Sequence, residues 1–110
     1  MPIHWLARSL AFRLMQIALR CATTQQFLSF HEQQWLHGID PAAHPWLAQL
    51  LRVPRGGIAP SELPTAMDEL LACLALQDPT DTIIRRSGLR LLLLLATGQR
   101  QGQPVSWQHR

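Results

Sequence analysis

Residues 81–98 read DTIIRRSGLRLLLLLATG, and this stretch decides the fold that the sequence predicts. We expect a helix from about Asp81 to Thr97 that ends at Gly98, because a glycine just past a helix can adopt the left-handed conformation that closes it. Leucine stands at position 89 and at positions 91–95, so apolar side chains point in every direction around this helix. A helix that is apolar on all sides is buried on all sides. The pattern therefore predicts a central core helix, or one that packs against another molecule.

Four further stretches have the spacing of short amphipathic helices, with apolar residues three and four positions apart. The clearest runs through Leu76 and starts at Ser61 or Thr65, either of which can cap it. A second, residues 25–37, follows Thr23 and Thr24 as candidate caps. The other two cover residues 3–20 and 45–52. Between them, proline and glycine break the chain, and residues 53–60, VPRGGIAP, are typical of a loop.

These patterns predict an all-α fold, a small single domain of four to five short helices with a central apolar C-terminal helix. With 110 residues the chain has the length of one ordinary domain. We assign residues 1–98 to this helical domain. Residues 99–110 are rich in glutamine and arginine, and we expect them to form a flexible polar tail, because polar chain ends are commonly poorly ordered.

The charge is positive but modest. The formal net charge is +3, and all ten basic residues are arginine. Lysine, asparagine and tyrosine are absent, and because their codons are AT-rich we infer a GC-rich bacterial or phage genome. Three net charges spread over the chain are weaker than the clustered basic face that is typical of nucleic-acid-binding proteins. Charge alone therefore does not assign a nucleic-acid partner.

The sequence favours a cytoplasmic protein. Cys21 and Cys73 lie among apolar residues, so we interpret both as small buried side chains, and a disulfide between them stays as the alternative. No apolar run reaches the length of a transmembrane helix, and arginines interrupt the apolar runs that a signal peptide would need. Residues 3–20 would be the candidate for a basic helix on a membrane surface, but we do not expect membrane binding.

The sequence contains no recognisable catalytic or metal-binding pattern. Two histidines on one helix face would need a spacing of three or four residues, and none of the five histidines has it. No serine lies in a G-x-S-x-G turn. The acidic residues stand where helix starts or solvent-facing positions are expected, which the helix dipole explains. We expect no enzymatic activity, no catalytic or metal-binding residues and no cofactor.

Our leading interpretation is a small regulatory or adaptor protein that acts through protein–protein interaction, as an anti-activator or a complex subunit, and that also forms a homodimer. The all-round leucine helix favours this function, because four short helices offer it few neighbours. Leu89, Leu92 and Leu93 are its candidate partner-binding residues. Trp107 is the fourth, since a tryptophan in a polar tail must dock on a partner or on its own domain, and tryptophan is enriched at interface hot spots.

The alternative is a DNA-binding transcriptional regulator that uses arginines. Arg85, Arg86 and Arg90 form the densest basic cluster, and Arg86 and Arg90 share one helix face. Arg52 and Arg55, which flank the proline at the start of the expected loop, would add to this surface. Such a protein would bind DNA with an affinity that falls steeply as salt rises.

Overall fold

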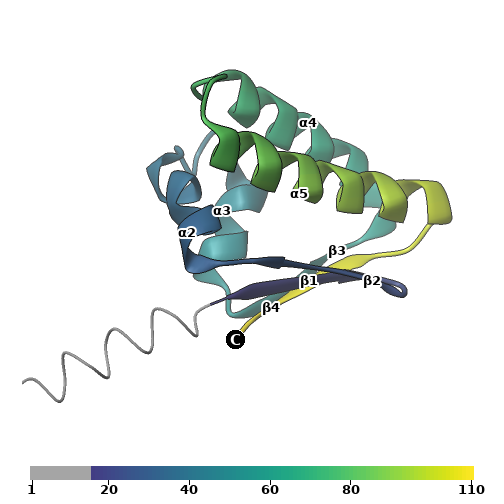
Figure 1. The fold of residues 1–110 in the computed structure, drawn as a ribbon. Coiled ribbons are helices and arrows are strands. Elements are labelled where there is room, and N and C mark those ends of the chain that lie inside the picture. Colours follow the sequence, from purple (N-terminus) through teal and green to yellow (C-terminus); the bar gives the residue numbers. More distant parts are fainter. Residues whose placement is uncertain (1–15) are drawn as a thin grey trace, which may run out of the picture.

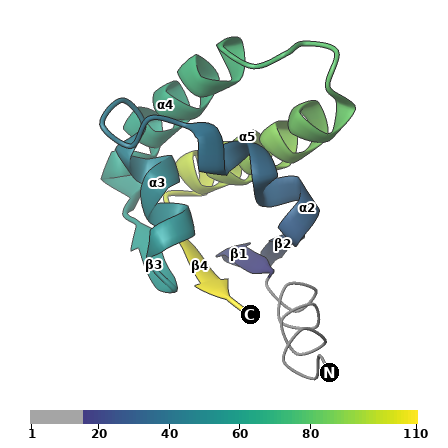
Figure 2. The same ribbon diagram turned by 90° about the vertical axis from the view of Figure 1, so that its left-hand side faces the viewer.

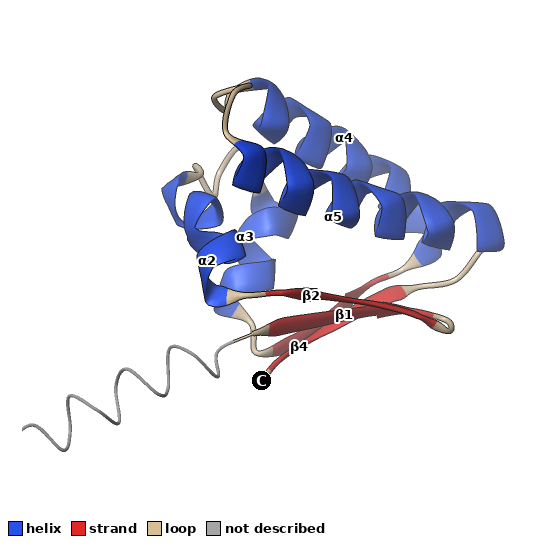
Figure 3. Cartoon of the chain, in the orientation of Figure 1, coloured by secondary structure: helices blue, strands red, loops and turns tan. Residues whose placement is uncertain are grey.

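The protein has an α+β fold, so the all-α prediction is wrong. The computed structural model describes residues 16–110 (Figure 1). Four antiparallel strands form one sheet, and the helices pack on one side of it (Figure 3). In chain order the elements are β1 (Ile17–Cys21), β2 (Thr24–Leu28), α2 (Phe30–Gln33), the 3₁₀ helix η1 (Gln34–Gly38), α3 (Pro45–Arg52), β3 (Arg55–Ile58), the 3₁₀ helix η2 (Pro60–Glu62), α4 (Leu63–Ala75), α5 (Thr82–Gln101) and β4 (Val105–His109).

The first two strands replace parts of two expected helices. The expected helix over residues 3–20 ends in strand β1, and its residues 3–15 lie outside the described residues. Strand β1 reads IALRC and buries four of its five residues, so it lacks the alternation of apolar and polar residues that marks a half-buried strand. Strand β2 occupies the start of the expected helix 25–37. Neither of these two five-residue strands shows a period of two in its sequence.

A different residue starts the helical part of that second stretch. Ser29 caps α2, because its side chain accepts a hydrogen bond from the Glu32 amide and the Glu32 carboxylate accepts one from the Ser29 amide. The expected caps Thr23 and Thr24 lie instead at the hairpin. Ala22 and Thr23 form the turn between β1 and β2, with Ala22 at a φ of 53°.

The other two strands come from the expected loop and the expected tail. Residues 55–58 of the predicted loop form β3. Residues 99–110 contain the last turn of α5 and all of β4, so the prediction of a flexible polar tail is corrected. The strand order is β2-β1-β4-β3, which places the last strand in the interior of the sheet between β1 and β3. The end of the chain therefore completes the sheet.

Three helices of the prediction are confirmed. Helix α3 has the predicted bounds, and α4 ends one residue before Leu76. Helix α5 begins after Asp81, whose side chain accepts hydrogen bonds from the amides of Ile83 and Ile84. It passes through Gly98 and ends at Gly102, which has the left-handed φ of 64°.

Helix α5 occupies the middle of the molecule but is buried on only one side. It runs across the sheet, and α4 packs antiparallel against it (Figures 1 and 2). Leu91, Leu94 and Leu95 lie in the core, whereas Leu89 and Leu93 are 55% and 58% exposed. Consecutive leucines of α5 therefore do not all pack against other residues of the chain. The expectation that α5 is buried on all sides is wrong.

A single aromatic side chain fixes β4 within the sheet. Trp107 is almost fully buried, and its indole Nε1 donates a hydrogen bond of 2.9 Å to the Val53 carbonyl oxygen at the end of α3. The indole ring lies against Gly56, its partner across β3 and β4. A Cβ atom at Gly56 would stand 2.4 Å from Cζ2 of the ring. Real Cβ atoms essentially never approach another heavy atom this closely, so the ring or the strand would have to shift. Trp107 therefore docks on its own domain, and the glycine at position 56 is a requirement of sheet packing.

Replacement of Gly56 by alanine tests this contact. The new methyl group would overpack the site under the indole, and we expect Gly56→Ala to lower the free energy of unfolding by about 1–3 kcal/mol. Gly57→Ala is the matched control in the same strand, because a Cβ there meets only the Val105 carbonyl oxygen at an ordinary 3.4 Å. Urea unfolding followed by tryptophan fluorescence measures both. Equal stability of the two variants would contradict the described packing.

Candidate functional site

None of the helices within residues 16–110 covers one of the two faces of the sheet. All the described helices lie on the opposite side, as two views at right angles show (Figures 1 and 2). The strand registers identify the side chains that point to the bare side, because neighbours on paired strands share a face. We call this surface the outer sheet face, and it consists of Ala18, Arg20, Gln25, Phe27, Arg55, Gly57, Ser106, Gln108 and Arg110.

Three arginines project from this face, each from a different strand or strand end. Arg20 stands on β1 opposite Ser106, and Arg55 stands on β3 opposite Gln108. Arg110 follows β4 and is held by two backbone hydrogen bonds to Gln16, of 2.8 and 2.9 Å. A strand spacing of about 4.8 Å and a rise of about 3.4 Å per residue place these Cα atoms roughly 8–12 Å from their nearest arginine neighbour. The three cations therefore span the width of the sheet.

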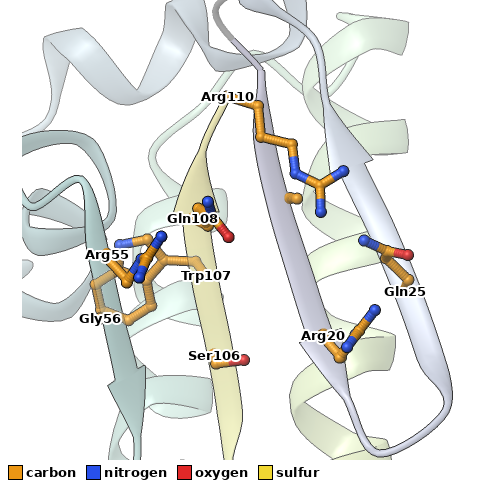
Figure 4. Close-up of a pocket in the computed structure, with 9 residues that line it drawn as sticks. Arg20, Gln25, Arg55, Gly56, Ser106, Trp107, Gln108 and Arg110 are labelled. Carbon is orange, nitrogen blue, oxygen red and sulfur yellow. The ribbon is translucent and has the colours of Figure 1, made fainter.

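The outer sheet face is hollowed between the arginines (Figure 4). A depression of about 330 Å³ is lined by Arg20, Arg55 and Arg110 together with Gln25, Ser106 and Gln108, and by Ala18, Gly56 and Trp107. Ala18, which is 5% exposed, lies between the larger Phe27 on β2 and Gln108 on β4 and forms part of the lining. The depression is thus rimmed by hydrogen-bonding groups.

An aromatic ring adjoins the basic residues. Phe27 is 40% exposed on β2, and the guanidinium carbon of Arg110 lies 5.8 Å from the centroid of its ring. This cation–π contact orients a flat, delocalised cation over an apolar surface. The outer sheet face therefore combines cationic, amide and aromatic groups on neighbouring strands.

The acidic residues are kept away from this face. The four strands contain none of the seven acidic side chains, which lie on helices, their caps and turns: Glu32, Asp40, Glu62, Asp68, Glu69, Asp78 and Asp81. Several of them have structural partners. For example, the two carboxylate oxygens of Glu69 accept hydrogen bonds from the amides of Trp46 and Leu47 at the start of α3. Within residues 16–110, no carboxylate side chain forms an ion pair with an arginine of the outer sheet face.

The five arginines predicted to bind DNA lie on three different elements, α3, β3 and α5. Arg90 forms an ion pair of 2.7 Å with Glu32, so part of its charge is compensated. Arg85 and Arg86 are exposed in the first turns of α5, and Arg52 is exposed at the end of α3. Of the five predicted residues, Arg55 alone lies on the outer sheet face.

The predicted partner-binding residues also separate into different surroundings. Leu89 and Leu93 are exposed on α5, and Leu92 is partly buried beside α4. Trp107 is buried in the core, with 3% of its surface exposed. Arg20, Gln25, Gln108 and Arg110, which the sequence analysis did not single out, lie together instead. The alternation of polar and apolar residues in VSWQH, residues 105–109, is the sequence pattern that could have indicated a strand there.

Cysteine and metal chemistry do not define a second site in the described part of the chain. Cys21 and Cys73 are free and buried, which confirms their interpretation as core residues. Burial raises the pKa of both thiols above the usual range, so the reactive thiolate is disfavoured. Among residues 16–110, no cluster of three histidine, cysteine or acidic side chains could hold a metal ion.

Comparison with known proteins adds no assignment. The chain matches no protein-family model, no curated protein sequence and no solved structure. Within residues 16–110, no helix has the combination of length and apolar character needed to cross a bilayer.

Proposed function

We propose that this protein binds nucleic acid through the outer sheet face, as a non-enzymatic binding module. The observation that carries the proposal is the set of three arginines without carboxylate partners on a face that no described helix covers. In a small chain with nearly balanced charge, this segregation gives one surface a positive potential. The proposal keeps nucleic acid as the partner but moves the site from the predicted helix cluster to the sheet.

Arginine chemistry suits this role. A guanidinium group donates hydrogen bonds in a planar fork that matches two phosphate oxygens, and it stacks on flat rings. The Arg20, Arg55 and Arg110 groups are separated by one or two strands, so each could contact a different phosphate along one backbone. The glutamine and serine side chains between them supply further donors and acceptors.

The surroundings of the two thiols support a cytoplasmic location. Cys21 and Cys73 stay free and buried, as is usual in a reducing compartment. A binding module with access to nucleic acid in a bacterial or phage-infected cell would meet its partner there. Regulation of transcription is one such role, because occupancy of a nucleic-acid site can itself be regulatory.

Removal of the three face arginines tests the proposal. The triple variant Arg20→Gln/Arg55→Gln/Arg110→Gln should bind a fluorescent oligonucleotide about tenfold more weakly or worse, because it loses three charge-assisted contacts. The slope of the logarithm of affinity against the logarithm of salt concentration should fall by about 2. Fluorescence anisotropy over a series of salt concentrations measures both quantities.

A matched control distinguishes binding at the outer sheet face from an effect of the protein's net charge. Arg85→Gln/Arg86→Gln/Arg100→Gln removes the same three charges from exposed positions on α5 and should keep its affinity within about threefold. Circular dichroism would verify the fold of both variants. An equal loss of affinity in the control would overturn the sheet site and favour the helix cluster.

A second candidate function is self-association through the outer side of α4 and α5. Leu71, Leu89 and Leu93 are each about half exposed there, and we call these three residues the hairpin face. Contact of Gly88 with Leu74, and of Gly98 with Leu63, shows that the helices run antiparallel. Exposed leucines on one surface fit an apolar interface, which agrees with the dimer predicted from the leucine-rich helix.

Charge favours a second copy of the chain as the occupant of the hairpin face. Exposed Arg85 and Arg86 lie beside the end of α4, whereas exposed Asp68 lies nearer its start. A two-fold axis through Leu89 would bring the basic end of one copy toward Asp68 of the other. Such a self-complementary pairing is what a two-fold dimer requires.

Sedimentation equilibrium tests self-association. The full chain should behave as a dimer at tens of micromolar, and Leu89→Glu/Leu93→Glu should be monomeric without loss of thermal stability, because both leucines are exposed before association. Gln49→Glu/Gln99→Glu is the control, since it adds the same charge at exposed polar positions. A wild-type chain that stays monomeric up to high micromolar concentration would exclude this function.

A further inference from the structure

We infer that the hollow of the outer sheet face is a subsite for an unpaired nucleobase, so that the protein selects single-stranded over duplex nucleic acid. This inference rests on the proposed function and specifies its substrate class. It starts from the shape of the face. Phosphate groups can bind to a flat basic surface and do not require a depression. The outer sheet face nevertheless has a hollow of about 330 Å³. This volume lies near the lower end of the range for small-molecule sites.

The lining of the hollow suits a flat ring with polar edges. Gln25 and Gln108 present side-chain amides, each with a donor and an acceptor, and Ser106 adds a hydroxyl group. Amides of this kind pair with the edges of bases. All three residues face the hollow, Gln25 from β2 and the other two from β4 (Figure 4). The rim can therefore hydrogen-bond an inserted base around its edge.

Flat groups are also in place for stacking. Arg110 lies over Phe27, and Arg20 stands on the adjoining strand. Unstacked bases in single strands stack on aromatic rings and on guanidinium planes. In a duplex the bases are already stacked and paired, so none is available to enter the hollow without an unpairing cost. The same surface thus favours a single strand.

The dimensions of the sheet agree with a short single-stranded site. Strands of five residues are about 17 Å long at a rise of about 3.4 Å per residue. Four-stranded sheets that bind single-stranded RNA stack two or three bases over a comparable face. The hollow would take one of these bases, and the arginines would hold the phosphates on either side of it.

The test compares a fluorescent eight-nucleotide single strand with a blunt duplex of the same sequence, using the full chain. We expect the single strand to bind at least about tenfold more tightly. Ala18→Leu adds bulk to the lining of the hollow without changing any charge, and should weaken single-strand binding about tenfold while leaving the salt slope unchanged. Gln108→Ala gives a milder variant and should change the relative affinities for homopolymers of different bases.

The possible outcomes distinguish the base subsite from the binding of phosphates by the arginines. Equal affinity for single strand and duplex, or no effect of Ala18→Leu in a folded protein, would overturn the base subsite but leave phosphate binding by the arginines intact. If Ala18→Leu fails to fold, an unchanged base preference in Gln108→Ala would overturn the subsite instead. Absence of binding to either probe would overturn the proposed function itself.

Discussion

The packing of Trp107 against Gly56 is the contact on which the sheet depends. The indole fills the space where any other residue at position 56 would have a Cβ atom, and its Nε1 is tied to the Val53 carbonyl oxygen. These two contacts join β4, β3 and the end of α3 at one point. His109 adds to the connection, since its ring nitrogen Nε2 lies 2.6 Å from the Leu50 carbonyl oxygen. These contacts add to the strand pairing that holds the last strand between β1 and β3.

The position of β4 also determines which side chains lie on the outer sheet face. Because β4 alternates, the burial of Val105 and Trp107 on the helical side requires Ser106 and Gln108 to point to the bare side. The same alternation turns Arg20 outward between Leu19 and Cys21, which are buried. Core packing on one side of the sheet thus determines which polar groups gather on the other side. The basic face follows from the register of the strands.

Sequence patterns predicted the helices of this protein better than its sheet. Helix α3 was predicted with its bounds because Pro45 and a regular apolar spacing mark it clearly, and α5 was predicted from its leucine-rich run. The strands were missed because each has four or five residues, and β1 carries apolar residues on both faces. Glycines at positions 56 and 57 suggested a loop, whereas the reason for Gly56 is a tryptophan 51 positions later in the chain.

The candidate site shows the same limit. Arg55 was singled out from the sequence, but its association with Arg20 and Arg110 depends on pairing between residues far apart in the chain, which local patterns do not reveal. Similarly, exposure of Leu89 and Leu93 depends on where α5 meets the sheet and α4 rather than on the leucine pattern. Long-range strand pairing therefore changed both the location and the composition of the predicted surfaces.

The most direct test of the account is a map of the bound surface by nuclear magnetic resonance. Uniformly ¹⁵N-labelled protein would be titrated with a short single-stranded oligonucleotide, with backbone amides and arginine Nε signals followed together. The account predicts shifts at Arg20, Gln25, Gln108 and Arg110, with Arg85 and Arg86 unchanged. Shifts confined to the start of α5, or spectra that do not respond to the oligonucleotide, would contradict it.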